Sequence, residues 1–130
     1  MGVKEFEPNT IQAITTETAG IRQFPTGATR NNDPDRLDFE GFLCPLVIES
    51  YAKYLHKNRL QADGQLRDSD NWQKGISKKV YMKSKWRHFW MTWKLHRHPK
   101  TKAEIIESLC AEMFNTMGYL HELLKESKNG

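Results

Sequence analysis

Residues 84–97 (SKWRHFWMTWKLHR) constrain the fold most, because they hold three of the four tryptophans and have helical spacing. At 100° per residue, one side of that helix carries large aromatic side chains and an arginine: Trp86, Phe89, Trp90, Trp93 and Arg97. A second side is lighter and more polar: Tyr81, Ser84, His88, Met91 and Leu95. Such a helix has to be covered on two sides, by other parts of the chain or by another subunit. We interpret the tryptophan side as core rather than as a ligand platform, because large aromatics at this spacing usually pack.

His88 on the lighter side of this helix allows two interpretations. We favour a core histidine whose ring nitrogens have partners within the fold. The alternative is functional, because Arg87 beside it would add donors that leave the same turn and could grip an anion or phosphate.

Length and charge limit the class of protein. The chain has 130 residues, which suits one domain, and its hydrophobic content of 38% is lean enough that we expect a homo-oligomer. The net charge of +4 is mild and dispersed, which disfavours nucleic acid as a partner and allows a site for small polyanions. Neither Cys44 nor Cys110 has metal-ligand spacing, and we find no signal peptide or membrane span, so we expect a reduced, cytoplasmic protein.

The N-terminal part predicts an arm followed by a loop. Residues 1–25 are rich in threonine, with weak strand propensity at residues 11–16, and we assign them to an arm or a short edge strand. Residues 27–30 and the turn cluster of residues 31–35 predict a loop. Arg30 and Arg36 are either solvated here or held over a site by the turns around them.

Three helices are predicted after this loop. The first runs from Pro45 to about Asn58, and Glu49 on it is either a surface acid or a carboxylate aimed at a cation. The second begins after Ser77 and ends before Pro99. The third begins at a capping box in residues 101–104, and we expect its tail, residues 125–130, to fray.

The last helix has two contrasting sides. We assign one as its core stripe: Ile106, Leu109, Cys110, Met113, Met117, Leu120 and Leu124. The opposite arc lacks bulk and includes carboxylates: Glu107, Ala111, Asn115, Gly118 and Glu122. This arc either faces water, which we favour, or lines a pocket where small residues leave space.

The connection of residues 59–76 is long and polar, and a compact domain rarely keeps such a loop without a use. It contains the cations Arg59, Arg67 and Lys74, the carboxylate of Asp68, and a single tryptophan, Trp72. An isolated aromatic among cations can stack on a base while the cations hold phosphates. For Trp72 itself, anchoring of the loop to the core is the interpretation we favour.

The available chemistry centres on carboxylates from two helices. Glu49 and Glu107 lie near inner faces, and carboxylates of packed helices are a usual way to hold Mg²⁺. With arginine and lysine nearby, such an ion could activate water against a nucleotide phosphate. No Gly-rich phosphate loop or nucleophile elbow occurs in the sequence.

Several motifs carry a resemblance to a known family: GATR, RLDFEGFL, ADGxxRDSDNWQKG, YMKSxWRHF and FNxMGYLHE. Over about residues 26–125 the chain resembles a phage family named for the N-terminal domain of a dATP/dGTP diphosphohydrolase. Such proteins are similar to MazG-like all-α nucleotide pyrophosphatases, which bind Mg²⁺ and a nucleoside triphosphate between helices of a multimer. The resemblance implies that family motif positions fall on one set of residues: Arg30, Arg36, Arg59, Arg67, Asp68, Trp72, Lys74, Arg87, His88, Glu107 and Asn115.

The departures from the MazG-like pattern concern the metal ligands. Those enzymes carry EExxE on one helix and ExxD on a later one. Here only Glu49 stands near the first motif, and Ala111 follows Glu107 where an acid is expected. The weakened acid set counts against catalysis and leaves nucleotide binding intact.

We therefore predict an all-α, oligomeric bundle of three main helices, with an arm at residues 1–25 and one nucleotide-binding domain at residues 26–127. The leading function is a Mg²⁺-dependent purine (deoxy)nucleoside triphosphate diphosphohydrolase of a phage, acting in the cytoplasm of the infected host. Its metal ligands would be Glu49 and Glu107, with Glu107 and His88 catalytic. The phosphate and ligand contacts would come from the remaining positions: Arg30, Arg36, Arg59, Arg67, Asp68, Trp72, Lys74, Arg87 and Asn115. The alternative is a non-catalytic sponge that sequesters a nucleotide or cyclic-nucleotide immune signal of the host.

Overall fold

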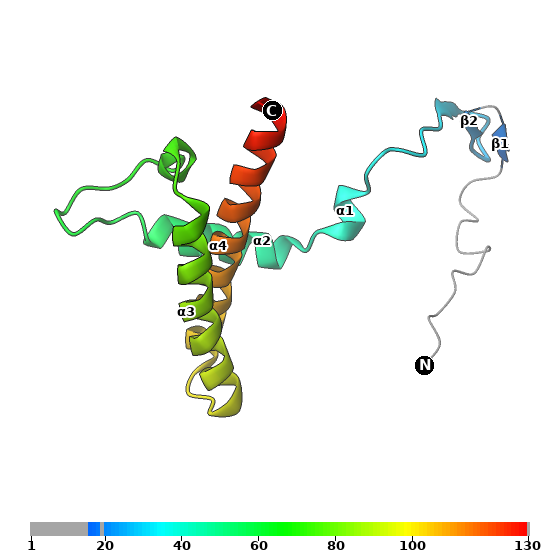
Figure 1. The fold of residues 1–130 in the computed structure, drawn as a ribbon. Coiled ribbons are helices and arrows are strands. Elements are labelled where there is room, and N and C mark those ends of the chain that lie inside the picture. Colours follow the sequence, from blue (N-terminus) through cyan, green and yellow to red (C-terminus); the bar gives the residue numbers. More distant parts are fainter. Residues whose placement is uncertain (1–15, 19, 130) are drawn as a thin grey trace. The chain divides into compact units, whose positions relative to one another are not determined.

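The protein is mostly helical, as predicted (Figure 1). A computed structural model describes residues 16–18 and 20–129. The chain divides after Phe42 into two units, and each is described by itself. Among the described helices, none combines the length and apolar composition needed to cross a bilayer.

The first unit contains a small antiparallel sheet that the sequence analysis did not predict. Its strands are β1 (Thr16–Thr18), β2 (Ile21–Gln23) and β3 (Thr29–Asn31), in that order. Gly27, with φ of 90°, closes the β2–β3 turn, where its N–H donates to the Phe24 carbonyl over 2.8 Å. The loop prediction for residues 27–30 is therefore wrong at Thr29 and Arg30. Most of the predicted strand at residues 11–16 lies outside the described residues.

The three predicted helices agree closely with their predicted bounds, and two shorter helical elements were not predicted. After the short α1 (Phe39–Phe42) come α2 (Pro45–Lys57), the 3₁₀ turn η2 (Asn71–Lys74), α3 (Lys78–Arg97) and α4 (Lys102–Asn129). The Ser77 hydroxyl accepts from the Val80 N–H over 3.3 Å, and the Thr101 hydroxyl accepts from the Glu104 N–H over 3.2 Å. The predicted fraying of the tail is wrong, because α4 continues to Asn129.

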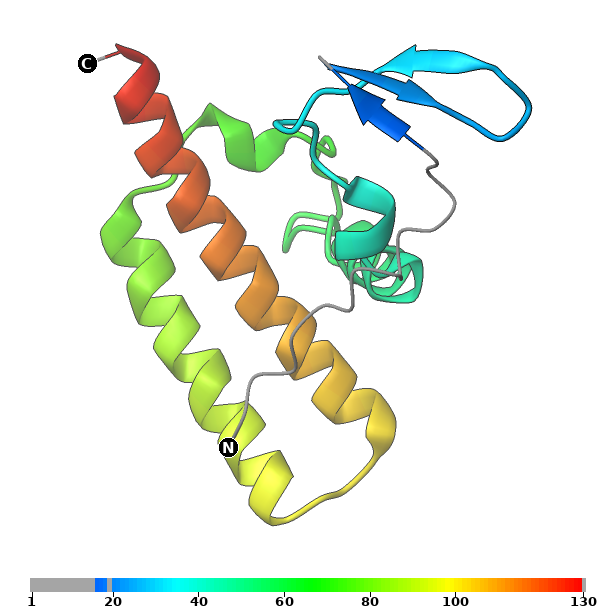
Figure 2. The ribbon, with the colours of Figure 1, turned by 90° about the vertical axis from the view of Figure 1, so that its right-hand side faces the viewer.

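α3 and α4 lie side by side and antiparallel, and their contact forms the core of the second unit (Figures 1 and 2). Among the described residues, the buried ones are few and mostly small: Tyr81, Leu95, Ser108, Cys110, Ala111, Asn115 and Gly118. Tyr81 reaches α4 at Gly118, where an added Cβ would stand 2.6 Å from its hydroxyl oxygen and closer still to its ring. Glycine at this position therefore lets the largest buried side chain lie directly on the α4 backbone.

This packing corrects the two faces assigned to the last helix. The arc that we expected in water contains the buried Ala111, Asn115 and Gly118. Most of the expected core stripe is instead well exposed, including Leu109 (46%) and Leu120 (52%), although Cys110 is buried. The reason is steric, since a tyrosine ring can approach a helix closely only on the side where side chains are small.

A polar network joins the two helices at the middle of their contact. The Thr92 hydroxyl lies 2.5 Å from both the Ser108 hydroxyl and a Glu112 carboxylate oxygen. Ser108 donates to the backbone carbonyl of His88 over 3.1 Å. These groups satisfy one another in a partly buried place, which favours a single register between the helices.

α2 crosses α4 and packs on it through polar and sulfur-containing side chains. The Tyr51 hydroxyl donates to the Met117 sulfur over 3.4 Å, and Ser50 lies 3.9 Å from the sulfur of Cys110. Burial raises the pKa of Tyr51 to about 12, with smaller contributions from Cys110, Tyr54 and Tyr81. Leu46 and Val47 in the first turn of α2 are exposed.

The tryptophan side of α3 points away from α4. Its aromatic residues remain 44–64% exposed: Trp86, Phe89, Trp90 and Trp93. Trp90 and Trp93 contact each other edge to face, with ring centroids 5.3 Å apart. The prediction that this side is core is therefore wrong for a single described chain. Cover by another subunit stays a prediction.

Candidate functional site

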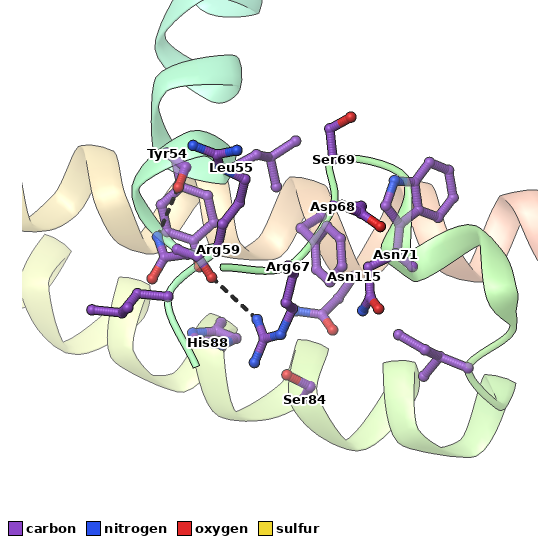
Figure 3. A pocket seen from close by; sticks show the side chains of 15 residues that line it. Tyr54, Leu55, Arg59, Arg67, Asp68, Ser69, Asn71, Ser84, His88 and Asn115 are labelled. Atoms are coloured by element: carbon purple, nitrogen blue, oxygen red, sulfur yellow. Dashed lines mark hydrogen bonds between the residues drawn. The ribbon is translucent and has the colours of Figure 1, made fainter. Parts of the chain in front are cut away.

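The second unit encloses a cavity of about 590 Å³ between α2, α3, α4 and the loop that joins α2 to α3 (Figure 3). This volume is in the range of small-molecule sites. Fifteen residues line it: Tyr54, Leu55, Asn58, Arg59, Leu60, Arg67, Asp68, Ser69, Asn71, Trp72, Ile76, Ser84, His88, Phe114 and Asn115. The lining is mixed, and both the helices and the loop contribute apolar and polar side chains.

The loop is a small irregular hairpin rather than an open connection. Leu60 and Leu66 form a β-bridge, and Gly64, with φ of 84°, supplies the backbone conformation of the turn. The N–H of Arg67 donates to the carbonyl of Arg59 over 2.8 Å. This pairing places the backbones of two arginines that are eight positions apart in the sequence side by side, and both residues line the cavity.

Backbone carbonyls orient both arginine side chains. An Nη of Arg67 donates to the Asn58 carbonyl over 3.1 Å, as the dashed line in Figure 3 shows. Nε of Arg59 donates to the His56 carbonyl over 3.2 Å. A guanidinium has five N–H donors, so in the described structure these bonds leave most of each group able to bind an anion.

Trp72 fixes the far end of the loop. Its ring meets the ring of His121 on α4 edge to face, with centroids 4.7 Å apart. This contact holds η2 on α4 and supports the interpretation of Trp72 as an anchor. The same tryptophan also lines the cavity, so anchoring does not prevent it from contacting a ligand.

α3 and α4 form the opposite wall. In Figure 3, Ser84 and His88 rise from α3 towards the loop. Asn115 on α4 is only 4% exposed and donates from its amide nitrogen to the Ala111 carbonyl over 2.8 Å. That bond fixes the amide plane and sets the direction of the remaining amide groups.

Five of the predicted ligand residues and the predicted catalytic His88 therefore line one cavity, the five being Arg59, Arg67, Asp68, Trp72 and Asn115. Lys74 and Arg87 belong to the second unit, but they do not line the cavity. Arg30 in β3 and Arg36 in the following loop are exposed residues of the first unit.

Several lining residues were missed from the sequence. Tyr54 and Asn58 occupy the last turn and the end of α2, directly before Arg59. Burial raises the pKa of Tyr54, with smaller contributions from Glu107 and Cys110, so its hydroxyl stays protonated at neutral pH and can donate to a ligand. The position of Tyr54 and Asn58 in the sequence could have indicated this, because residues at the end of a helix lie close to the loop that follows it.

The carboxylates predicted to bind Mg²⁺ are each held by a lysine. Glu49 pairs with Lys53 over 3.5 Å, and Glu107 pairs with Lys57 over 2.9 Å. Glu49 precedes Lys57 by eight residues, which is about 12 Å along a helix axis. Within the described residues, no three acidic, histidine or cysteine side chains gather as a metal site. In the described structure each of the two carboxylates has a lysine partner, and Mg²⁺ binding stays a prediction.

Comparison of the chain with protein families, with curated proteins and with solved structures gives no match. The case for a function therefore rests on the cavity and on the residues around it.

Proposed function

We propose that this protein binds a nucleotide in the cavity beside the 58–76 loop and retains it intact. The observation that carries the proposal is the gathering of Arg59, Arg67, His88 and Trp72 around one space of nucleotide size. These residue types supply two groups for phosphate and an aromatic ring for a base.

The phosphate end would lie against the two arginines. Their side chains come from adjacent strands of one hairpin and are already oriented by backbone carbonyls, which lowers the entropy lost on binding. His88 on the opposite wall adds a ring nitrogen as a donor. Asp68 beside Arg67 would repel phosphate, so we expect it to bind a hydroxyl or an amino group of the ligand instead.

The small number of carboxylates in the cavity lining favours retention of the nucleotide over its cleavage. Of the fifteen lining residues, Asp68 is the one with a carboxylate, and Glu49 and Glu107 lie outside the lining. The hydrolytic alternative, a Mg²⁺-dependent purine nucleoside triphosphate diphosphohydrolase with Glu107 and His88 catalytic, stays a prediction. A phage protein of the retaining kind would sequester a host nucleotide signal in the cytoplasm of the infected cell.

Titration calorimetry with dATP, dGTP, ATP and cyclic dinucleotides tests the proposal. We expect Arg67→Ala and Arg59→Ala each to weaken binding of the best ligand by about tenfold or more, because each removes charge-assisted hydrogen bonds. Arg97→Ala, at the exposed end of α3 outside the cavity lining, is the matched control and should change the Kd less than twofold. Equal affinity of wild type and Arg67→Ala, with circular dichroism unchanged, would exclude this cavity.

Chromatography of the same mixtures, with Mg²⁺ or with EDTA, separates retention from hydrolysis. Intact nucleotide released by heating the protein is the expected result. Product that forms only with Mg²⁺ and is lost in Glu107→Gln would establish the hydrolase instead. Product that forms equally in Glu107→Gln would remove Glu107 from the mechanism.

A further inference from the structure

The outer side of α3, defined by Trp86, Phe89, Trp90 and Trp93, is a continuous apolar stripe. Each of these side chains is at least 44% exposed in the described chain, and Trp86 is 64% exposed. Isolated apolar residues are normal on a protein surface, but four large aromatics in a row usually mark a binding surface.

The charges along α3 restrict what can cover this stripe. The helix contains seven lysines and arginines and no aspartate or glutamate. Exposed cations border the stripe along its length: Lys79, Lys83, Lys94 and Arg97. A second α3 would bring like charges together, so the partner should be both apolar and acidic.

The chain itself contains a segment of this kind. Residues 33–43 (DPDRLDFEGFL) carry four carboxylates and one arginine. The large apolar side chains of the segment are more than half exposed: Leu37 (66%), Phe39 (64%), Phe42 (76%) and Leu43 (53%). The segment therefore complements the outer side of α3 in charge and in apolar character.

We propose that the acidic segment of one copy, residues 33–43, packs on the outer side of α3 of a second copy, and that the two copies exchange this contact reciprocally. Four half-exposed aromatics on α3 offer about 400 Å² of apolar surface, if each is worth 150–250 Å² when fully buried. The four apolar side chains of the segment offer about as much. Because each copy supplies both surfaces, the contact buries about 800 Å² per copy, which is the size of a standard specific interface.

The experiment exchanges the charges of the two surfaces. Asp35→Lys with Glu40→Lys changes the net charge of the segment from −3 to +1 and keeps Asp38, which accepts from the Gly41 N–H. Lys79→Glu, Lys83→Glu and Lys94→Glu together change the charge of the four cations along the stripe from +4 to −2. Light scattering after gel filtration should give twice the chain mass of 15.2 kDa for wild type and the single-chain mass for each of the two variants. An equimolar mixture of the two variants should return to the dimer mass, because each reversed surface then meets its opposite.

Three outcomes would overturn the proposal. A monomeric wild type would mean that no second copy covers α3, including the case in which the chain covers it with its own segment. Variants that remain dimeric would place the interface elsewhere. Variants that are folded by circular dichroism but stay monomeric when mixed would show that charge pairing between these surfaces does not drive association.

Discussion

The two sides of α3 differ in a way that its composition does not suggest. The side facing α4 carries one large aromatic residue, yet Tyr81 is 1% exposed and Leu95 is 6% exposed. The outer side carries three tryptophans and a phenylalanine, and all remain substantially exposed in the described chain. The side that is buried within one chain is the side that a neighbouring helix can approach closely. Apolar bulk alone indicates that a surface will be covered, but it does not say by what.

We expect the largest loss of stability when a side chain is added in the space that Tyr81 occupies. Gly118→Ala places a Cβ 2.6 Å from the tyrosine hydroxyl oxygen and against its ring. We expect the free energy of unfolding to fall by about 3 kcal/mol, because overpacking a close contact outweighs the gain of about 1 kcal/mol in helix propensity. Urea denaturation measures this loss. Thr116→Ala, at an exposed position of the same helix, should change stability by less than about 0.5 kcal/mol.

A loss below about 0.5 kcal/mol in Gly118→Ala would contradict the close contact, because it would mean that the ring of Tyr81 can withdraw freely. The contrast between the two sides of α3 would then have no steric basis.

A smaller loss is expected when the polar network on the same side is broken. Thr92→Val keeps the shape of the side chain and removes the hydroxyl that contacts Ser108 and Glu112. We expect a loss of about 2 kcal/mol, because partly buried acceptors and donors lose their partner. Thr116→Val is the control, since it makes the same change at an exposed site. If Thr92→Val and its control are equal in stability, the network contributes nothing to the register of the helices.

The helix ends were predictable because their signals are local. Pro45, Ser77 and the Thr101–Glu104 box each act within one turn, and the structure places helix starts at all three. The short strands were missed because each has three residues, too few to show an alternating pattern, and their hydrogen bonds form only when they pair. Which side of α4 is buried depends on the contact of Tyr81 with Gly118. That contact joins two different helices, so no local sequence pattern predicts it.

The candidate site was partly predictable for the same reason. The long polar loop with Arg59, Arg67 and Trp72 was recognised from its length and its residue types, and the structure gathers these residues. The role expected for Glu107 depended on a neighbour in space, and the structure pairs it with Lys57. Spacing along one helix could not reveal that lysine, because it comes from another helix.

The smallest effect is expected on the outer side of α3, and it depends on the state of association. In a chain kept monomeric by Asp35→Lys with Glu40→Lys, Trp90→Ser should cost less than about 1 kcal/mol, because the side chain is 55% exposed and gives up mainly its ring contact with Trp93. In the dimer that we propose, the same change should cost more, and the loss should grow with protein concentration. Urea denaturation of both proteins at two concentrations measures the difference. A cost of about 3 kcal/mol in the monomeric chain would equal that of Gly118→Ala and would show that one chain packs both sides of α3.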